Sequence, residues 1–86
     1  MHEQAQRSLR VYSRPGCHLC DELIESLLPV IRGRLALEVV DIDSRSAWQD
    51  EFFDRIPVVE FEGEFLCQYT LDKAAIERIL ARLAAS

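Results

Sequence analysis

The sequence lacks any hydrophobic run that approaches the roughly 20 residues of a membrane-spanning helix. It also lacks a basic cluster, because its 10 Lys and Arg residues are scattered among 15 Asp and Glu residues and the net charge is −5. Proteins that bind nucleic acid contact phosphates through clustered Lys and Arg side chains. We therefore expect that neither a membrane nor a nucleic acid is a partner of this protein.

Repeats, linkers and glycine-rich phosphate loops are absent as well. Residues 1–7 are polar and contain neither a basic start followed by an apolar run nor a cleavage-like site. The three cysteines, an odd number, fit a reducing compartment better than a secreted fold held by disulfides. Both features predict a cytoplasmic protein. Because 86 residues have room for one core, residues 1–86 are predicted to form a single domain in which residues 1–7 are frayed.

Two cysteines form a C-x-x-C motif, Cys17 and Cys20, after a strand-like segment and at the start of a helix-like one. This spacing brings both sulfur atoms within bonding reach once the second cysteine lies on the first helical turn. Unpaired N–H groups and the dipole at a helix N-terminus favour the thiolate of the first cysteine, and a thiolate is the attacking species in disulfide exchange. The motif therefore predicts a redox site in which Cys17 attacks and Cys20 resolves.

Neighbouring charges are expected to tune this site. A helix terminus alone lowers a thiol pKa of about 8.5 by at most roughly 1–1.5 units. Further lowering needs other groups, and Arg14 and His18 are the candidates. His18 can also donate a hydrogen bond to sulfur while neutral. The alternative is that His18 is an exposed residue at the helix start with no role.

Two other interpretations of the motif remain open. C-x-x-C is also half of a zinc site, but a structural zinc site needs four ligands and the chain contains no second C-x-x-C or H-x-x-x-H pair. Cys17 and Cys20 could instead be two inert structural thiols. From the ligand count we predict no metal site.

Hydrophobic periodicity and turn residues divide the chain into strands and helices. The predicted strands are 8–13, 35–43, 58–61 and 65–67; the predicted helices are 17–32, a short one from 46 that ends before 56, and a last one from 70 to about 83. Pro29 is expected to kink or loosen the last turn of the first helix, which Gly33 closes. Pro57 stops the second helix, and Gly63 is expected to form the tight turn of a hairpin.

Several details follow from local patterns. Residues 35–43 are mostly apolar on both sides, which is typical of a strand covered on both faces in a parallel β-α-β unit. Ser46 begins a capping box, and Thr70 is the predicted cap of the last helix. We interpret the aliphatic stripes and one aromatic trio as core rather than as cofactor contacts. The stripe of the first helix is formed by Leu19, Leu23, Ile24, Leu27, Leu28 and Ile31, and the trio is Trp48, Phe52 and Phe53.

The order strand, helix, strand, helix, hairpin, helix, with the C-x-x-C after the first strand and a proline before the hairpin, resembles the glutaredoxin branch of the thioredoxin fold. The likeness covers nearly the whole chain. It is greatest to small bacterial glutaredoxin-like proteins of unassigned function, whose opening is similar to residues 12–20 here, Tyr-Ser-Arg-Pro-Gly-Cys-His-Leu-Cys.

The resemblance implies an α/β, thioredoxin-like three-layer sandwich of β-α-β-α-β-β-α order with a mixed four-stranded sheet, in which the two parallel strands are neighbours. It implies that the C-x-x-C lies at the C-terminal edge of these strands, where open α/β sheets bind ligands. It also implies that the Ile56–Pro57 bond is cis and packs against the sulfur atoms of the site.

The chain departs from the glutaredoxin pattern in two places. His18-Leu19 stands where the family usually has Pro-Tyr, and Cys67-Gln68 aligns with a Gly-Gly pair that holds glutathione together with an acidic residue. Added side chains are expected to keep backbone N–H groups from a small anion. We therefore expect glutathione as a weak co-substrate at most, with no other cofactor and a protein dithiol as reductant. Cys67 would lie near the glutathione groove, as a buried strand-end thiol or, alternatively, a working one.

The motif and the resemblance together predict a glutathione- or dithiol-linked thiol–disulfide oxidoreductase with Cys17 and Cys20 as its catalytic pair. The residues predicted to position the substrate are Arg14, His18, Ile56 and Pro57. The expected partner is a disulfide-containing protein or a small thiol, and the reducing system stays open. The alternative is an adaptor, or a zinc- or iron–sulfur-binding protein, that holds its partner through Cys17 and Cys20 without turnover.

Overall fold

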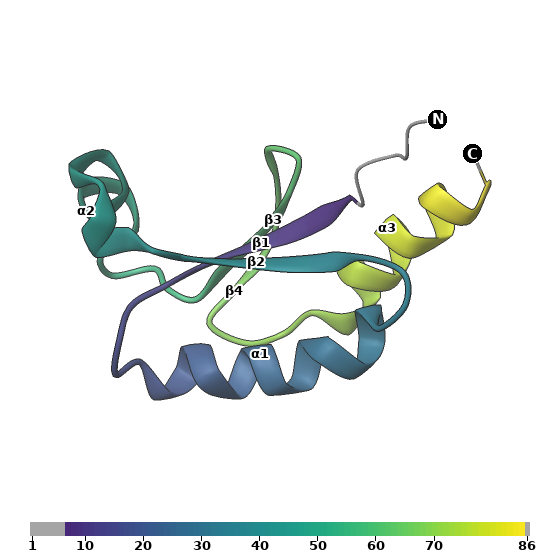
Figure 1. Cartoon of the computed structure of the whole chain (residues 1–86), viewed down its shortest axis with the longest axis horizontal. Coiled ribbons are helices and arrows are strands. Elements are labelled where there is room, and N and C mark those ends of the chain that lie inside the picture. The colour runs from purple at the N-terminus through teal and green to yellow at the C-terminus, as the bar shows by residue number, and fades with distance from the viewer. Residues whose placement is uncertain (1–6, 86) are drawn as a thin grey trace.

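The computed structural model describes residues 7–85. Its elements are β1 (Ser8–Ser13), α1 (His18–Ile31), β2 (Ala36–Asp41), a short 3-10 helix η1 (Ile42–Ser44), α2 (Ser46–Phe52), β3 (Val58–Phe61), β4 (Glu64–Gln68) and α3 (Lys73–Ala85). Apart from η1, this is the predicted order (Figure 1). Fraying was predicted for residues 1–7, of which residues 1–6 lie outside the described part. Arg7 is described, and its guanidinium bonds to the Glu62 carboxylate at 2.8 Å. Within residues 7–85, we find no helix with the length and apolarity to span a bilayer.

The four strands form one mixed sheet in the order β2-β1-β3-β4. β1 and β2 are parallel and are joined by α1, the long crossover that parallel neighbours require. β3 is antiparallel to both β1 and β4. The β3–β4 turn has positive φ at both central residues, 51° at Glu62 and 88° at Gly63, which suits a tight hairpin between twisted strands. The predicted mixed four-stranded sheet is confirmed.

Helices cover both faces of the sheet, so the molecule has three layers. α1 and α3 lie on one face, and α2 lies on the other at one end (Figure 1). Successive strand residues point to opposite faces, so on β1 Leu9 and Val11 enter the larger core while Tyr12 enters the smaller one. The larger core is formed by Leu9, Val11, Leu23, Leu27, Ile31, Leu35, Val59, Phe61, Cys67, Ile76, Ile79 and Leu80; the smaller by Tyr12, Ile42, Phe52 and Val58.

α1 buries one stripe of its surface against the sheet. Leu23, Leu27 and Ile31 are at most 3% exposed, because side chains four residues apart lie on the same helix face. Leu19 and Leu28, which we also predicted to be core residues, are 50% and 41% exposed. Leu28 lies beside the stripe, whereas Leu19 is in line with it but lies on the first turn of the helix. The core prediction was therefore too wide for this helix.

The end of α1 depends on Gly33 rather than on Pro29. The helix continues through Pro29 to Ile31. Gly33 then has a φ of 78°, and the N–H groups of Arg34 and Leu35 both donate to the Ile31 carbonyl, at 2.9 and 3.0 Å. A residue with positive φ just past a helix end is the usual place for glycine.

β2 differs from the prediction. It is an edge strand with no fully buried residue, and Val39 is 49% exposed. The predicted strand covered on both faces is wrong, because β2 lies at the sheet edge: Val39 is exposed although its partner Val11 lies in the larger core on the same face. The strand also ends at Asp41 instead of residue 43, since Ile42 begins η1.

Two predicted caps and one predicted core residue are also wrong. The N-cap of α2 is Arg45, without a side-chain hydrogen bond, so Ser46 does not form a capping box. Asp72 rather than Thr70 caps α3, because its carboxylate accepts the Ala75 N–H at 3.1 Å. Phe53 is 61% exposed, since it lies just past the end of α2.

Candidate functional site

A tight turn brings the first cysteine to the start of α1. Arg14-Pro15-Gly16-Cys17 is closed by a hydrogen bond from the Cys17 N–H to the Arg14 carbonyl at 3.2 Å, and Gly16 has a φ of 83°. Proline followed by a residue at positive φ is the pattern of a type II turn, which explains why Pro15 and Gly16 stand here. The turn directly follows β1, so Cys17 lies at the C-terminal edge of the parallel strands, as the resemblance implied.

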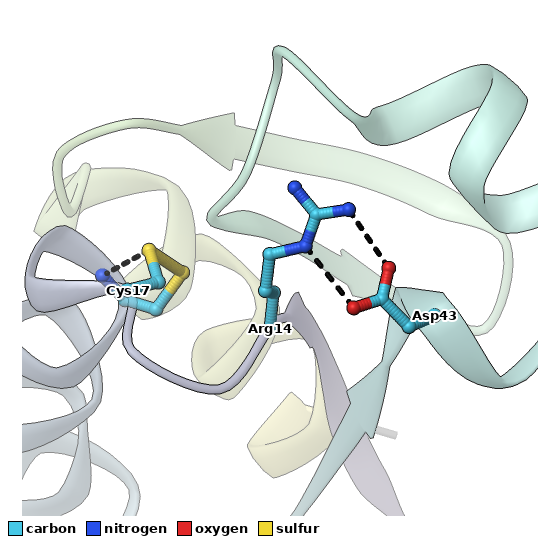
Figure 2. The surroundings of a disulfide bond; sticks show 4 residues. Arg14, Cys17 and Asp43 are labelled. Atoms are coloured by element: carbon cyan, nitrogen blue, oxygen red, sulfur yellow. Dashed lines mark hydrogen bonds and ion pairs between the residues drawn. A yellow bond between two sulfur atoms is a disulfide. The ribbon is translucent and has the colours of Figure 1, made fainter.

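Cys17 and Cys20 are joined by a disulfide, with their Cα atoms 5.2 Å apart (Figure 2). Cys17 is the N-cap residue of α1, and its Sγ accepts the backbone N–H of Cys20 at 3.1 Å. A hydrogen bond to sulfur and the positive end of the helix dipole both favour a thiolate at this atom after reduction. Cys17 is half-buried, whereas Cys20 is fully buried, so external reagents reach Cys17 more easily.

The Arg14 side chain is directed to Asp43 instead of to the sulfur atoms. Its Nη2 and Nε donate to the two carboxylate oxygens of Asp43 at 2.8 and 3.2 Å (Figure 2). Gln49 of α2 donates to the same carboxylate at 3.0 Å. The hydrogen bonds from Arg14 and Gln49 hold the pKa of Asp43 below its ordinary value. The positive charge expected to act on Cys17 therefore has a fixed counter-charge.

Asp43 was missed by the sequence analysis. It is 29 residues from Arg14 in the chain, and only the sheet register shows that the two are neighbours. Ser13 at the end of β1 lies opposite Asp41 at the end of β2, so the residues that follow the two strands meet at one edge. The available signal was the side-by-side pairing of the two parallel strands, which the resemblance implied.

The other predicted positioning residues lie near this edge. His18 is exposed on the first residue of α1, and its ring has no hydrogen-bond partner among residues 7–85. The Ile56–Pro57 bond is cis, as the resemblance implied, and Pro57 is fully buried. Because Tyr12 lies opposite Val58, the preceding Pro57 lies next to the end of β1, from which the loop to Cys17 leaves. Packing of Pro57 against the sulfur atoms stays a prediction.

Cys67 lies in the larger core, 7% exposed, opposite Val59 in the sheet. Burial raises the pKa of its thiol, so it is protonated near neutral pH and a poor nucleophile. Its side chain is part of the larger core. This supports the interpretation of Cys67 as a buried strand-end thiol.

In the fully reduced protein, we expect iodoacetamide near pH 7 to alkylate Cys17 first and Cys67 last. The raised pKa keeps the Cys67 thiol neutral where an exposed thiol, at about 8.5, begins to ionise. Because the Cys67 pKa is higher in the folded protein than in the unfolded one, keeping this thiol protonated stabilises the folded protein. This contribution to the free energy of unfolding is complete below the unfolded-state pKa and is lost as the pH rises through the folded-state pKa. Timed mass mapping checks the order, with Cys67→Ala as control. Modification of Cys67 or Cys20 ahead of Cys17 would overturn it.

Two hollows flank the C-x-x-C, and both have acidic residues. One, of about 150 Å³, is lined by Leu19, Glu22 and Tyr69 among others. The second, of about 270 Å³, is lined by Arg14, Asp21 and Asp41 among others. Arg14 is paired with Asp43, so its positive charge does not neutralise the acidic side chains that line the two hollows. Within residues 7–85, no three His, Cys, Asp or Glu side chains are grouped so that they could hold a metal ion.

Comparison with known proteins gives concordant matches. A family model described as Glutaredoxin-like domain (DUF836) matches residues 8–81. The solution structure of protein Ne2328 from Nitrosomonas europaea is 38% identical with a TM-score of 0.76, covering 92% of this chain and 98% of that one. Oxidized glutaredoxin 2 from Chlamydomonas reinhardtii is 28% identical with a TM-score of 0.57, covering 92% and 80%. The "Glutaredoxin-like protein YDR286C homolog" of Dictyostelium discoideum is 27% identical over 73 residues, 77% of this chain and 68% of that protein.

Proposed function

The chain belongs to the glutaredoxin-like domain family and has the thioredoxin-like fold, and from this premise we propose that it is a thiol–disulfide oxidoreductase. The Cys17–Cys20 pair, at disulfide distance in this fold, supports a thiol redox role in general. The observation that carries the proposal is the asymmetry of the pair. An accessible sulfur caps the helix, and a fully buried one lies beneath it on the first turn.

The proposed reaction starts from the reduced protein. The Cys17 thiolate attacks one sulfur of a substrate disulfide, the substrate S–S bond breaks, and the departing thiolate takes up a proton. The remaining half of the substrate is then bound to Cys17 as a mixed disulfide. Cys20 loses its proton and attacks Cys17 Sγ, which releases the second substrate thiol and forms the Cys17–Cys20 disulfide. Two electrons have passed to the substrate, and an external dithiol returns the protein to its reduced form.

The remaining site residues are proposed to position the substrate. Ile56 and Pro57 precede β3, which pairs with β1 at the edge from which the C-x-x-C loop leaves. His18 is exposed beside Cys17, where a bound substrate can reach it. We expect Arg14 to act on this site only together with its counter-charge, Asp43.

The proposal of weak glutathione use rests on charge. Cys67 faces the core, and the Gln68 side-chain oxygen accepts a hydrogen bond from Arg55 Nε at 3.2 Å, so we base the proposal on charge rather than on these two side chains. Glutathione disulfide carries excess negative charge, and so does this protein, at −5. Glu22 in one hollow and Asp21 and Asp41 in the other add acids beside the pair. A partner protein whose disulfide is flanked by neutral or basic residues fits this surface better.

We expect the rate of disulfide reduction to follow the charge of the disulfide. Cystamine, bis(2-hydroxyethyl) disulfide and 3,3′-dithiodipropionate all have two carbons between sulfur and the polar group, and differ in being cationic, neutral and anionic. The second-order rate constants with the reduced protein should fall in that order, by up to about fivefold per step, since an exposed charge contact contributes about 1 kcal/mol at most.

Each rate is divided by the rate of the same disulfide with dithiothreitol, which removes differences in intrinsic reactivity. The preference should shrink in roughly 0.5 M salt, because the charges are exposed and screened. Reduction of the anionic disulfide ahead of the neutral one would contradict the charge argument. If none of the three disulfides is reduced, the proposed function itself is contradicted.

A further inference from the structure

Three elements meet at Asp43. Arg14 comes from the loop after β1, Asp43 from η1 after β2, and Gln49 from α2. Both carboxylate oxygens of Asp43 accept from Arg14, and one also accepts from Gln49 at 3.0 Å. Figure 2 shows the guanidinium facing the carboxylate, with the disulfide on the other side of the Arg14 side chain. A carboxylate held from two sides is a fixed partner, and a bidentate pair also fixes the orientation of the guanidinium.

We propose that Asp43 is a positioning residue that sets the reactivity of Cys17 by holding the Arg14 guanidinium away from its sulfur. The inference rests on the proposed function, because it concerns the tuning of the same cysteine pair. A guanidinium is charged at every relevant pH. Three residues from Cys17 and unpaired, it would favour the Cys17 thiolate; bonded to Asp43, it belongs to a pair with no net charge, whose field decays faster than that of a single charge.

Other ionisable groups also lie near Cys17, and the substitutions at positions 14 and 43 replace none of them. On α1 these are His18, Asp21 and Glu22, and the Cys20 thiol of the site itself. From β2 comes Asp41, whose carboxylate accepts the Asp43 N–H at 2.8 Å. From the segment between β4 and α3 comes Tyr69, whose hydroxyl donates to the Asp54 carbonyl at 2.7 Å. The charge of Asp41 also acts on Arg14, so the Arg14–Asp43 pair is isolated by comparing Asp43→Asn in the presence and absence of Arg14.

The test compares four proteins: wild type, Asp43→Asn, Arg14→Gln and the double variant. Asparagine keeps the shape of Asp43 and an acceptor oxygen for Gln49, but has no charge. The Cys17 pKa is read from the pH dependence of iodoacetamide alkylation in the reduced proteins, with mass mapping to Cys17. We expect Asp43→Asn to lower the Cys17 pKa by at least about half a unit, which increases the thiolate fraction about threefold below that pKa.

The double variant separates an action through Arg14 from a direct effect of the carboxylate. If Asp43 acts through Arg14, the lowering caused by Asp43→Asn is at most about half as large in the Arg14→Gln protein, since no cation remains to be released. An equal lowering in both backgrounds would overturn the proposal, and so would an unchanged or raised Cys17 pKa in Asp43→Asn.

Glu38→Gln is the matched control. It also replaces an acid by its amide on the β2 side of the sheet, and it also breaks an ion pair, with Arg10 at 3.0 Å, but it lies in the middle of the strand. It should leave the Cys17 pKa unchanged, and an equal shift there would overturn the specific role of Asp43. Reduction of bis(2-hydroxyethyl) disulfide by the wild type is measured in parallel. A wild type that fails to reduce it refutes the proposed function, whereas the alkylation profile tests the tuning by itself.

Discussion

Replacing Cys17 with serine is expected to abolish disulfide reduction, with a loss of at least about a thousandfold. The serine hydroxyl does not ionise near neutral pH, so the attacking group is gone. Serine is a good N-cap residue, and its hydroxyl can accept the Cys20 N–H that now bonds to Cys17 Sγ, so α1 should keep its start. The measurement is reduction of bis(2-hydroxyethyl) disulfide by protein that was reduced and freed of reductant.

Cys20→Ser is the matched control for this experiment. It keeps the attacking thiol and removes the resolving one, so the first step proceeds and the mixed disulfide accumulates on Cys17. Mass spectrometry of the acid-quenched protein detects this adduct. Retention of more than about a tenth of the activity by Cys17→Ser, or an adduct on Cys67 instead of Cys17, would refute the assigned roles.

Leu27→Ala should have the largest effect on stability. Leu27 is 0% exposed in the larger core, and truncation of such a leucine costs about 2–5 kcal/mol in free energy of unfolding. Domains of this kind have a total of about 5–15 kcal/mol, so the variant should lose a large share of its stability. Urea unfolding of the oxidised protein, monitored by circular dichroism, measures the change.

Leu28 supplies the control within the same helical turn. It is 41% exposed, so Leu28→Ala should change the free energy of unfolding by no more than about 0.5 kcal/mol. Both substitutions replace leucine by alanine in α1 and share the same change in helix propensity. Equal destabilisation by the two would show that the described packing of α1 is wrong.

Much of this fold could be predicted because its local signals agree. The period of the leucines in α1, the alternation in β1 and the turn at Gly63 each indicate one structure, and each element was found close to its predicted place. The burial of β2 could not be predicted in the same way. Apolar residues on both sides of a strand do not tell which strands lie next to it, and Val39 is exposed because β2 is at the sheet edge.

The prediction of helix-capping residues failed for a related reason. Thr70 and Asp72 both have side chains that can cap a helix, and local sequence does not choose between them. The Thr70 N–H donates to the Gln68 carbonyl at 2.8 Å, which holds that residue in the turn after β4 and leaves Asp72 to begin α3.

The site residues likewise fall into those that local sequence reveals and those that only the folded structure reveals. Cys17 and Cys20 were found because their spacing is itself the chemical signal. Arg14 was assigned to Cys17 because the two are near in sequence, but the sheet register brings Asp43 to it. The cis bond before Pro57 entered only through the resemblance to a family, since the sequence of a single chain does not distinguish cis from trans proline.

The most direct test of the central claim is an equilibrium redox titration of the Cys17–Cys20 pair in dithiothreitol buffers, with the metal content of the same sample measured. Thiols are trapped by acid quench and alkylation, and each cysteine is mapped by mass. The account predicts one reversible two-electron transition, in which the ratio of disulfide to dithiol changes tenfold for about every 30 mV of potential. The transition should involve only Cys17 and Cys20 and should be absent from Cys20→Ser. Cys67 should remain a thiol throughout. A stoichiometric metal held by Cys17 and Cys20, or a pair with no reversible transition, would contradict it.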